Sequence, residues 1–234
     1  MCSTSWPSAR LFRQDRAMTE SVKITGFAAG PYQTNCYALI DVNTAQGVVI
    51  DPGLGAATKI QELFAQHSAT LTAVLLTHGH IDHVRDAGEL GVDVYIHESD
   101  QFMLEPGTIA PRHSGMLFDA AAMKVPNRIT YLRDGETISS AGVALTVRHA
   151  PGHSPGSVLL VADTFVFTGD VLFRGSIGRT DLDYADPEAM AATLRGPVWE
   201  LEDTLAVLPG HGPTSTVKHE RATNPFLREI SAQH

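Results

Sequence analysis

Apolar and polar positions along the chain fall into short runs whose spacing predicts a mixture of strands and helices. Residues 22–27 alternate apolar and polar side chains, which is typical of a strand with one buried face. Residues 56–66 instead place Ile60, Leu63 and Phe64 at helical spacing. The predicted strands are residues 22–27, 35–41, 47–50, 73–76, 92–96, 129–132, 143–149, 157–161, 164–168 and 205–208; the predicted helices are 56–66, 86–90, 98–104, 187–194 and 217–230, the last interrupted near Pro225. Strands and helices thus occur in two similar sets, and an α/β fold of two packed sheets with helices outside would bury both.

The domain organisation follows from length and from two stretches that lack periodicity. A chain of 234 residues fits one domain with one sizeable core, which we predict for residues 22–234. Residues 1–21 are predicted to be a disordered tail or an extension from an upstream start. They carry several arginines but lack the apolar stretch that marks a secretory signal. Residues 105–126 contain Pro, Gly and Ser, and we expect a long loop there that covers the site as a lid.

Composition narrows the classes of partner. A hydrophobic content of 43% with 18% charged residues is typical of a soluble globular protein, and no apolar run is long enough to cross a membrane. The net charge of -9 argues against binding to nucleic acid. Only Cys2 and Cys36 are present, which gives no disulfide framework. We therefore expect a cytoplasmic protein whose partner is a small molecule, with neither nucleic acid nor membrane involved.

Histidine and aspartate side chains gather directly after the apolar run 73–76. The next residues include His78, His80, Asp82 and His83 within six positions, with Gly79 where the backbone must bend tightly. Imidazole and carboxylate suit zinc, iron or manganese. Side chains this close in sequence point in different directions, so two adjacent metals would share the loop. An exposed polar loop is the alternative, but this spacing after an apolar strand favours a metal site.

Three later segments repeat the same design, in which an apolar strand ends in a turn with one ligand-type residue. His153 follows the strand 143–149, Asp170 follows 164–168 and His211 follows 205–208, each with a preceding glycine that allows close backbone approach. Any one of these could be an ordinary turn residue, whereas together with the first loop they predict a complete ligand set. We assign His78, His80 and His153 to one metal, Asp82, His83 and His211 to the other, and Asp170 to a bridging position between them.

These motifs resemble the metallo-β-lactamase superfamily, whose fold is a four-layer αββα sandwich. Within it, the stretches 168–173, 176–181 and 209–213 resemble short bacterial glyoxalase II-like hydrolases, and the resemblance covers roughly residues 22–227. Long glyoxalase II proteins carry a C-terminal helical domain with glutathione-binding residues, whereas this chain ends soon after His211. The resemblance therefore leaves the thiol carrier open.

The resemblance implies hydrolysis of an S-acyl thiol thioester, such as S-lactoylglutathione, to an acid and a free thiol. The expected cofactors are two divalent metal ions, zinc first and iron or manganese as alternatives, with a metal-bridging hydroxide as the nucleophile. Asp82 is expected to be catalytic as well as a ligand, because it would orient that nucleophile. Arg179 aligns with the family position where a basic residue contacts the carboxylates of the substrate. Asp51, at another strand end, could hydrogen-bond a ligand imidazole or simply cap a turn.

Other activities on the same scaffold remain as alternatives. A persulfide dioxygenase with one iron shares the run 178–181, whereas the stretch around His211 favours the hydrolase. A β-lactamase is less favoured, because those enzymes generally lack the bridging aspartate expected at Asp170. A metal-binding scaffold without activity is disfavoured by the complete ligand set.

Overall fold

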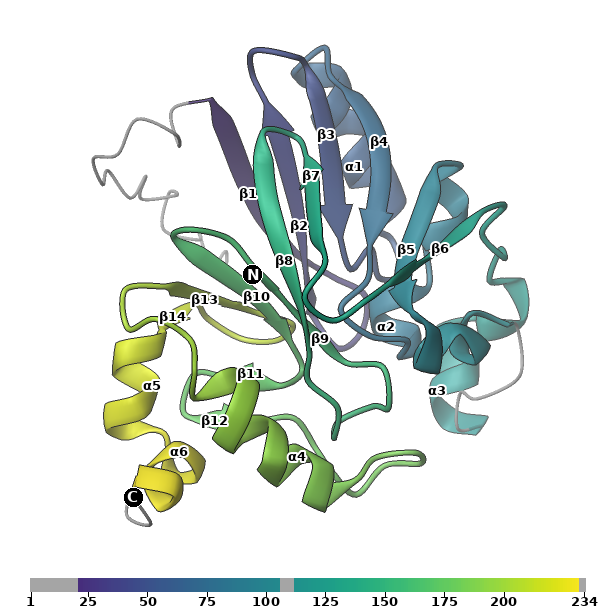
Figure 1. Ribbon diagram of the computed structural model, residues 1–234. Coiled ribbons are helices and arrows are strands. Elements are labelled where there is room, and N and C mark those ends of the chain that lie inside the picture. Colours follow the sequence, from purple (N-terminus) through teal and green to yellow (C-terminus); the bar gives the residue numbers. More distant parts are fainter. Residues whose placement is uncertain (1–20, 106–111, 232–234) are drawn as a thin grey trace, which may run out of the picture.

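Two facing sheets form the centre of the molecule, with helices on their outer surfaces (Figure 1). This is a computed structural model, and it describes residues 21–105 and 112–231. Each of the two sheets has six strands. The predicted αββα arrangement is confirmed. Apart from Ser21, the predicted tail lies outside the described residues.

The first sheet is built from the N-terminal half in simple chain order. Its strands are β1 (Val22–Ala29), β2 (Thr34–Asp41), β3 (Gln46–Ile50), β4 (Thr70–Leu75), β5 (Asp93–His97) and β6 (Ile129–Leu132). The first three pair antiparallel, and β3 to β6 pair parallel. Parallel pairing requires crossover connections, which here are α1 (Ala56–Gln66) and the segment of short helices after β4.

The second sheet comes from the C-terminal half and has the order β14-β13-β10-β9-β8-β7. Its strands are β7 (Thr137–Ser140), β8 (Val143–His149), β9 (Val158–Val161), β10 (Phe165–Gly169), β13 (Ala206–Pro209) and β14 (Ser215–Thr216). A separate hairpin of β11 (Leu172–Phe173) and β12 (Ser176–Ile177) follows β10. The helices of this half are α4 (Pro187–Thr193), α5 (Val217–Thr223) and α6 (Pro225–Ser231).

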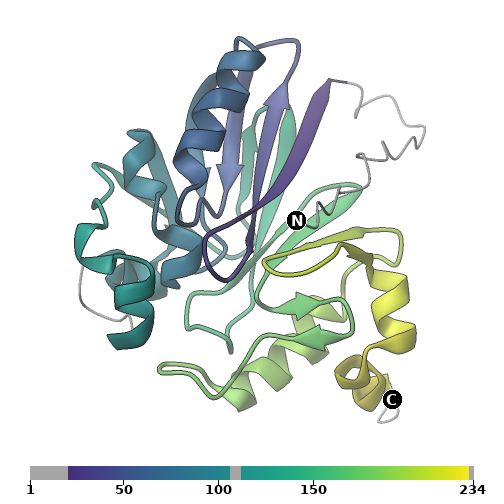
Figure 2. The same cartoon turned by 180° about the vertical axis from the view of Figure 1, so that it is seen from behind.

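Apolar side chains fill the space between the sheets and the space beneath the helices. Leu39 and Leu75 of the first sheet belong to the same buried cluster as Leu160 and Phe167 of the second. Figure 2 shows α1 lying over the outer face of the first sheet, where Ile60 and its neighbours are buried. Burying one such side chain stabilises the fold by roughly 1.5–3 kcal/mol, so the predicted periodicity accounts for the layering.

The predicted elements differ from the observed ones mainly where elements are short. A helix α2 (Ile81–Val84) begins inside the metal loop, and a π-helical turn (Leu194–Val198) follows α4. The helices predicted at 86–90 and 98–104 are both 3-10 helices (Ala87–Leu90 and Glu98–Leu104). The predicted loop 105–126 is wrong in part, since it contains α3 (Arg112–Leu117) and a 3-10 turn (Ala120–Ala122), while residues 106–111 lie outside the described residues. Met116 of α3 is 85% exposed, so this helix lacks the buried apolar stripe that reveals a helix in a sequence.

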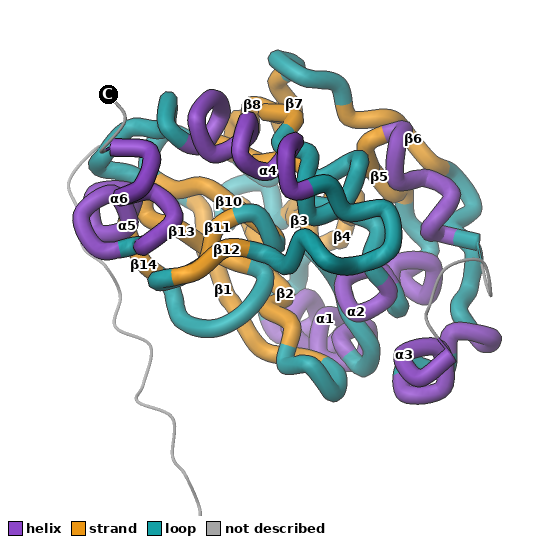
Figure 3. The backbone as a smooth tube through the Cα atoms, turned by 90° about the horizontal axis from the view of Figure 1, so that it is seen from below, coloured by secondary structure: helices purple, strands orange, loops and turns teal. Residues whose placement is uncertain are grey.

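The carboxyl ends of several strands point to one end of the sandwich. Seen from that end, the hairpin β11–β12 lies on the side of β10 and β13, and α2 lies on the side of α1 and β4 (Figure 3). The segments after β4, β8, β10 and β13 all carry predicted ligands. Among the residues that the structure describes, no helix combines the length and apolar character needed to span a membrane.

Candidate metal centre

The loop after β4 turns its histidines and aspartate inward through a glycine and one short helix. A Cβ atom on Gly79 would lie 2.7 Å from the Cβ atom of Met103, so no larger residue fits there. His80 is the N-cap residue of α2, whose first turn contains Asp82 and His83. Both of these side chains are buried. The local sequence therefore directs consecutive ligand-type residues to one point.

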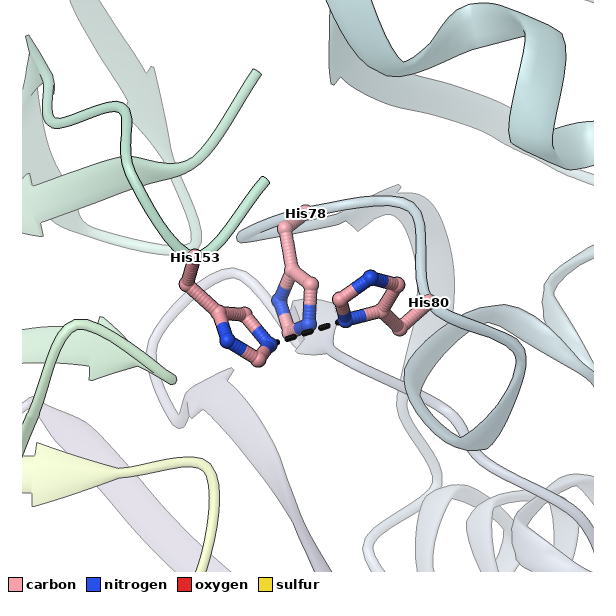
Figure 4. Close-up of side chains that lie close together, drawn as sticks. All are labelled: His78, His80 and His153. Atoms are coloured by element: carbon pink, nitrogen blue, oxygen red, sulfur yellow. Dashed lines mark hydrogen bonds between the residues drawn. The ribbon is translucent and has the colours of Figure 1, made fainter. Parts of the chain in front are cut away.

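His78, His80 and His153 form the first cluster (Figure 4). Their ligand atoms all lie within 4.8 Å of one another. The Nδ1 atom of His80 is 2.8 Å from the Nε2 atom of His153. Residues 75 positions apart along the chain thus converge, as predicted.

Asp82, His83 and His211 form the second cluster, again with ligand atoms within 4.8 Å of one another. The two imidazole Nε2 atoms are 3.3 Å apart, and that of His211 lies 3.1 Å from the Oδ2 atom of Asp82. This grouping matches the predicted ligand set of the second metal.

Asp170 lies between the two clusters. Its Oδ2 atom is 3.4 Å from the Nε2 atoms of both His153 and His211, and its Oδ1 atom is 3.3 Å from that of His83. A Cβ atom on Gly210 would collide with Asp170, so this glycine is needed for the close approach. The geometry is that expected of a bridging carboxylate, although the bridging role itself stays a prediction.

The donor set fits a metal ion. The buried Nε2 atom of His78 has no hydrogen-bond partner among the described residues, which is costly unless a ligand binds it. Imidazoles hold one nitrogen toward the centre when the other is engaged elsewhere. This is the case for His153, whose Nδ1 atom is 2.9 Å from the carbonyl oxygen of Arg179, and for His211, whose Nδ1 atom is 3.2 Å from that of Tyr32.

Asp51 orients His83, in agreement with the hydrogen-bonding alternative raised from the sequence. Its Oδ2 atom lies 2.9 Å from the Nδ1 atom of His83 and accepts a 2.6 Å hydrogen bond from the Thr77 hydroxyl group. Its Oδ1 atom accepts from the Thr77 amide at 2.8 Å. The backbone of Asp51 has a left-handed φ of 51°, which is uncommon for a residue with a side chain and is consistent with a functional constraint.

Asp100 is a buried residue of the site that the sequence reasoning missed. Its Oδ2 atom accepts hydrogen bonds from the Gly79 amide at 2.8 Å and the Ser154 hydroxyl at 2.6 Å. Its Oδ1 atom accepts from the Gly156 amide at 2.6 Å. Asp100 therefore joins the loop of His78 and His80 to the loop of His153. The sequence offers no signal for this, because two of the three donors are backbone amides.

Burial and neighbouring charges give the two clusters opposite proton affinities. Burial, together with the charge of His153, lowers the pKa of His80 to about 4. Burial alone would lower the pKa of His211, but its hydrogen bonds to Asp170 and Asp82 raise it to about 9. Burial would likewise raise the pKa of Asp82, but the His83 charge and the His211 hydrogen bond lower it to about 2. At neutral pH His80 is therefore uncharged, whereas His211 is a cation paired with carboxylates.

Comparison with known proteins decides the family. The family described as Metallo-beta-lactamase superfamily matches residues 29–211, which contain the whole candidate centre. The chain belongs to this superfamily. Its members are mostly metal-dependent hydrolases, and the superfamily binds a dinuclear metal site.

Two relatives resemble this chain in sequence over about nine-tenths of its length. An uncharacterized protein of Mycobacterium tuberculosis is 37% identical over 222 residues, covering 89% of this chain and 99% of the relative. Hydroxyacylglutathione hydrolase GloC of Haemophilus influenzae is 32% identical over 225 residues, covering 91% of this chain and 99% of GloC.

Solved structures share the metallo-β-lactamase fold. BLEG-1 B3 metallo-beta-lactamase has a TM-score of 0.76 at 32% identity, covering 88% of this chain and 99% of that one. TTHA1623, solved in a di-iron-bound form, has a TM-score of 0.71 at 35% identity, covering 87% and 100%. ETHE1 from Myxococcus xanthus has a TM-score of 0.70 at 23% identity, covering 91% of both chains, a likeness that shows the fold alone.

The centre opens into a cavity of about 560 Å³. His80, Asp82, His153, Asp170 and His211 line its floor. Arg179 also lines the cavity, at its exposed rim. Its guanidinium group is paired with Asp181 at 2.8 and 3.0 Å, and these side chains are 68% and 72% exposed.

Proposed function

We propose that the protein hydrolyses S-acyl thiol thioesters at this centre. The observation that carries the proposal is the convergence of seven ligand-type side chains on two clusters, with Asp170 in contact with both, at the floor of a cavity. The likeness to GloC supports a thioester as the substrate. S-lactoylglutathione and analogous thiol conjugates are the substrates to test.

We propose two divalent metal ions as cofactors, one in each cluster, with Asp170 between them. Zinc is the first choice by donor chemistry, and the di-iron form of TTHA1623 makes iron the principal alternative. When bound, such a pair supplies Lewis acidity and a nucleophilic water at neutral pH.

The residues of the chain position the reactants. Asp82 accepts a 2.9 Å hydrogen bond from the Thr34 hydroxyl, which fixes the orientation of its carboxylate beside the cavity. We propose that this carboxylate both binds metal and orients the attacking water. The leaving group needs no dedicated acid, because a thiol with a pKa of about 8.5 departs readily as the thiolate.

We propose that Arg179 binds a carboxylate of the thiol carrier at the rim. Its present partner, Asp181, is exposed, and exposed ion pairs contribute only about 0–1 kcal/mol. Exchange of Asp181 for a substrate carboxylate therefore costs little. A guanidinium group can bind that carboxylate through two parallel hydrogen bonds.

We also propose a cytoplasmic setting with a small-molecule partner. Cys36 is buried and free, which fits a reducing compartment. The net charge of -9 disfavours nucleic acid as a substrate.

The test is a hydrolysis panel on protein whose metal content is measured by elemental analysis. The panel contains S-lactoylglutathione, other acyl thioesters, a β-lactam because of the likeness to BLEG-1, and glutathione persulfide with an oxygen electrode. We expect about two metals per chain and turnover of thioesters that is lost on chelation and restored by metal. Oxygen consumption with one iron per chain, or turnover of the β-lactam alone, would replace the proposal by the corresponding alternative.

A further inference from the structure

The cavity above the metal centre has two apolar walls, one from each half of the chain. The N-terminal half contributes Ile81, Met103 and Met123, and the C-terminal half contributes Phe173, Ile177 and Leu182. Met103 and Met123 are buried, and Phe173, Ile177 and Leu182 are half-buried. A molecule bound to the centre thus extends between hydrocarbon surfaces.

Apart from the ligand-type side chains of the floor, the charged groups that line this cavity lie at its rim and are mostly acidic. Arg179 is the one lysine or arginine among the described residues that line the cavity, and Asp181 already pairs with it. Glu105 and Asp183 add negative charge at the exposed edge. Among the described side chains, the apolar walls therefore offer no lysine or arginine to an anionic acyl group.

The C-terminal wall is held in place from behind. Glu220 is fully buried, and it accepts hydrogen bonds from the Gly175 amide at 2.7 Å and from the Asn224 side chain at 3.0 Å. Asn224 in turn donates to the carbonyl oxygens of Phe173 at 3.3 Å and Ser176 at 3.0 Å. The hairpin β11–β12 is thus fixed to α5, so the apolar wall is pre-formed and its shape can discriminate between substrates.

We propose that the thioesters cleaved here carry an extended apolar acyl chain, and that short hydroxylated acyl groups such as lactoyl are poor substrates. This inference rests on the proposed function. Each methylene that moves from water into the cavity favours binding, whereas the hydroxyl group of lactoyl would lose its hydration against the apolar walls. The carrier occupies the rim beside Arg179. In the reaction the C–S bond breaks and a C–O bond to water forms, giving a carboxylate, a thiol and one released proton.

The first measurement is kcat/KM for S-acyl-N-acetylcysteamine thioesters, which share one neutral carrier. The acyl groups are acetyl, lactoyl, butanoyl, hexanoyl and octanoyl. We expect kcat/KM to rise by roughly threefold per methylene from acetyl to hexanoyl, on the scale of burying a CH₂ group, with lactoyl near or below acetyl. Equal rates across the series, or a maximum at lactoyl, would overturn the inference while leaving the proposed function intact.

Wall variants test where the preference arises. Leu182→Ser and Ile177→Ser should each lower the hexanoyl/acetyl ratio of kcat/KM at least about fivefold. The matched control is Ile24→Ser on β1, a partly exposed isoleucine outside the cavity, which should leave the ratio unchanged. Leu182 belongs to none of the apolar clusters, so its variant stays informative if Ile177→Ser fails to fold. An unchanged ratio in a folded Leu182→Ser protein counts against the apolar wall.

Calorimetric titration separates failure of this inference from failure of the proposed function. Hexanoate, the product carboxylate, should bind the metal-loaded protein at least about tenfold more tightly than acetate, and Leu182→Ser should reduce this difference. If no thioester is hydrolysed, the proposed function fails, and the same titration still decides whether the cavity selects apolar chains. Equal affinities would overturn the inference.

Discussion

The two clusters of the metal centre use the same imidazole chemistry but are held in different ways. In the first cluster all the ligand-type side chains are histidines, and Asp100 acts on the backbone of the two loops that carry them. In the second cluster Asp82 is itself a member, and Asp51 contacts the imidazole of His83 directly. Asp100 therefore supports the loops without contacting a ligand ring, whereas Asp51 holds the backbone at Thr77 and also contacts a ring.

This difference has an electrostatic counterpart. The low pKa of His80, which arises first from burial, keeps this imidazole neutral, whereas Asp82 adds a carboxylate to the second cluster; Asp170 contacts both clusters. A cation gains more Coulombic stabilisation beside carboxylates than beside neutral imidazoles. We therefore expect the second cluster to bind its metal more tightly than the first.

The largest expected effect comes from Asp170, which contacts both clusters. Asp170→Ala should weaken both metals and lower kcat by at least about a thousandfold, on the scale of losing a main electrostatic group of an active site. Metal content and kinetics check this, with Asp163→Ala, an exposed aspartate at the far end of β10, as the control. Wild-type turnover at full metal occupancy would refute the bridging role.

The next effect should fall mainly on the second cluster. Asp51→Asn alters the partner of His83 and should weaken the metal of this cluster by roughly 10–100-fold, the range for residues that orient a ligand. Chelator competition measures the two affinities separately. Asp41→Asn is the control, because Asp41 is also buried and hydrogen-bonded but lies away from the centre. Equal weakening of both metals would remove the distinction between the clusters.

A smaller effect is expected at the first cluster. Asp100→Asn keeps the shape of the side chain but replaces one acceptor oxygen by a donor group, and Ser154→Ala removes one of the three hydrogen bonds. Metal affinity at the first cluster should fall by about tenfold for the first variant and about threefold for the second, within the range for supporting residues. If the melting temperature falls and the metal affinities do not, Asp100 stabilises the fold without positioning the ligands.

The smallest effect concerns Arg179, which acts outside both clusters. Arg179→Ala should raise KM about fivefold for an anionic carrier such as glutathione, leave kcat nearly unchanged and hardly affect N-acetylcysteamine thioesters. Pairing with Asp181 makes this effect smaller than that of an unpaired arginine, because substrate must displace an existing partner. Equal losses on both carriers, or a fall in kcat alone, would count against carrier binding.

The sequence predicted much of the fold and the convergence of the centre because both depend on simple local patterns. Each of His78, His153, Asp170 and His211 follows an apolar strand, and strand ends meet at one edge of a sheet. The role of Asp100 could not be predicted, since its partners Gly79 and Gly156 are backbone donors on loops distant in sequence. The hairpin β11–β12 has only two residues per strand, and α3 exposes its apolar side chains. Neither element therefore has a hydrophobic periodicity that the sequence could reveal. For the same reason the apolar walls of the cavity were not predicted.

Each cluster takes its ligands from both sheets, and this has a consequence for cohesion. His78 and His80 follow β4 of the first sheet, whereas His153 follows β8 of the second; Asp82 and His83 are likewise opposed by His211. An ion that binds only the folded arrangement adds its binding free energy to the stability of that arrangement. Bound metal would then hold the two halves of the sandwich together at one end, while the apolar core stabilises the remainder. After chelation, amide hydrogen exchange should accelerate first at the carboxyl ends of β4, β8 and β13, while the opposite ends of these strands remain protected from exchange.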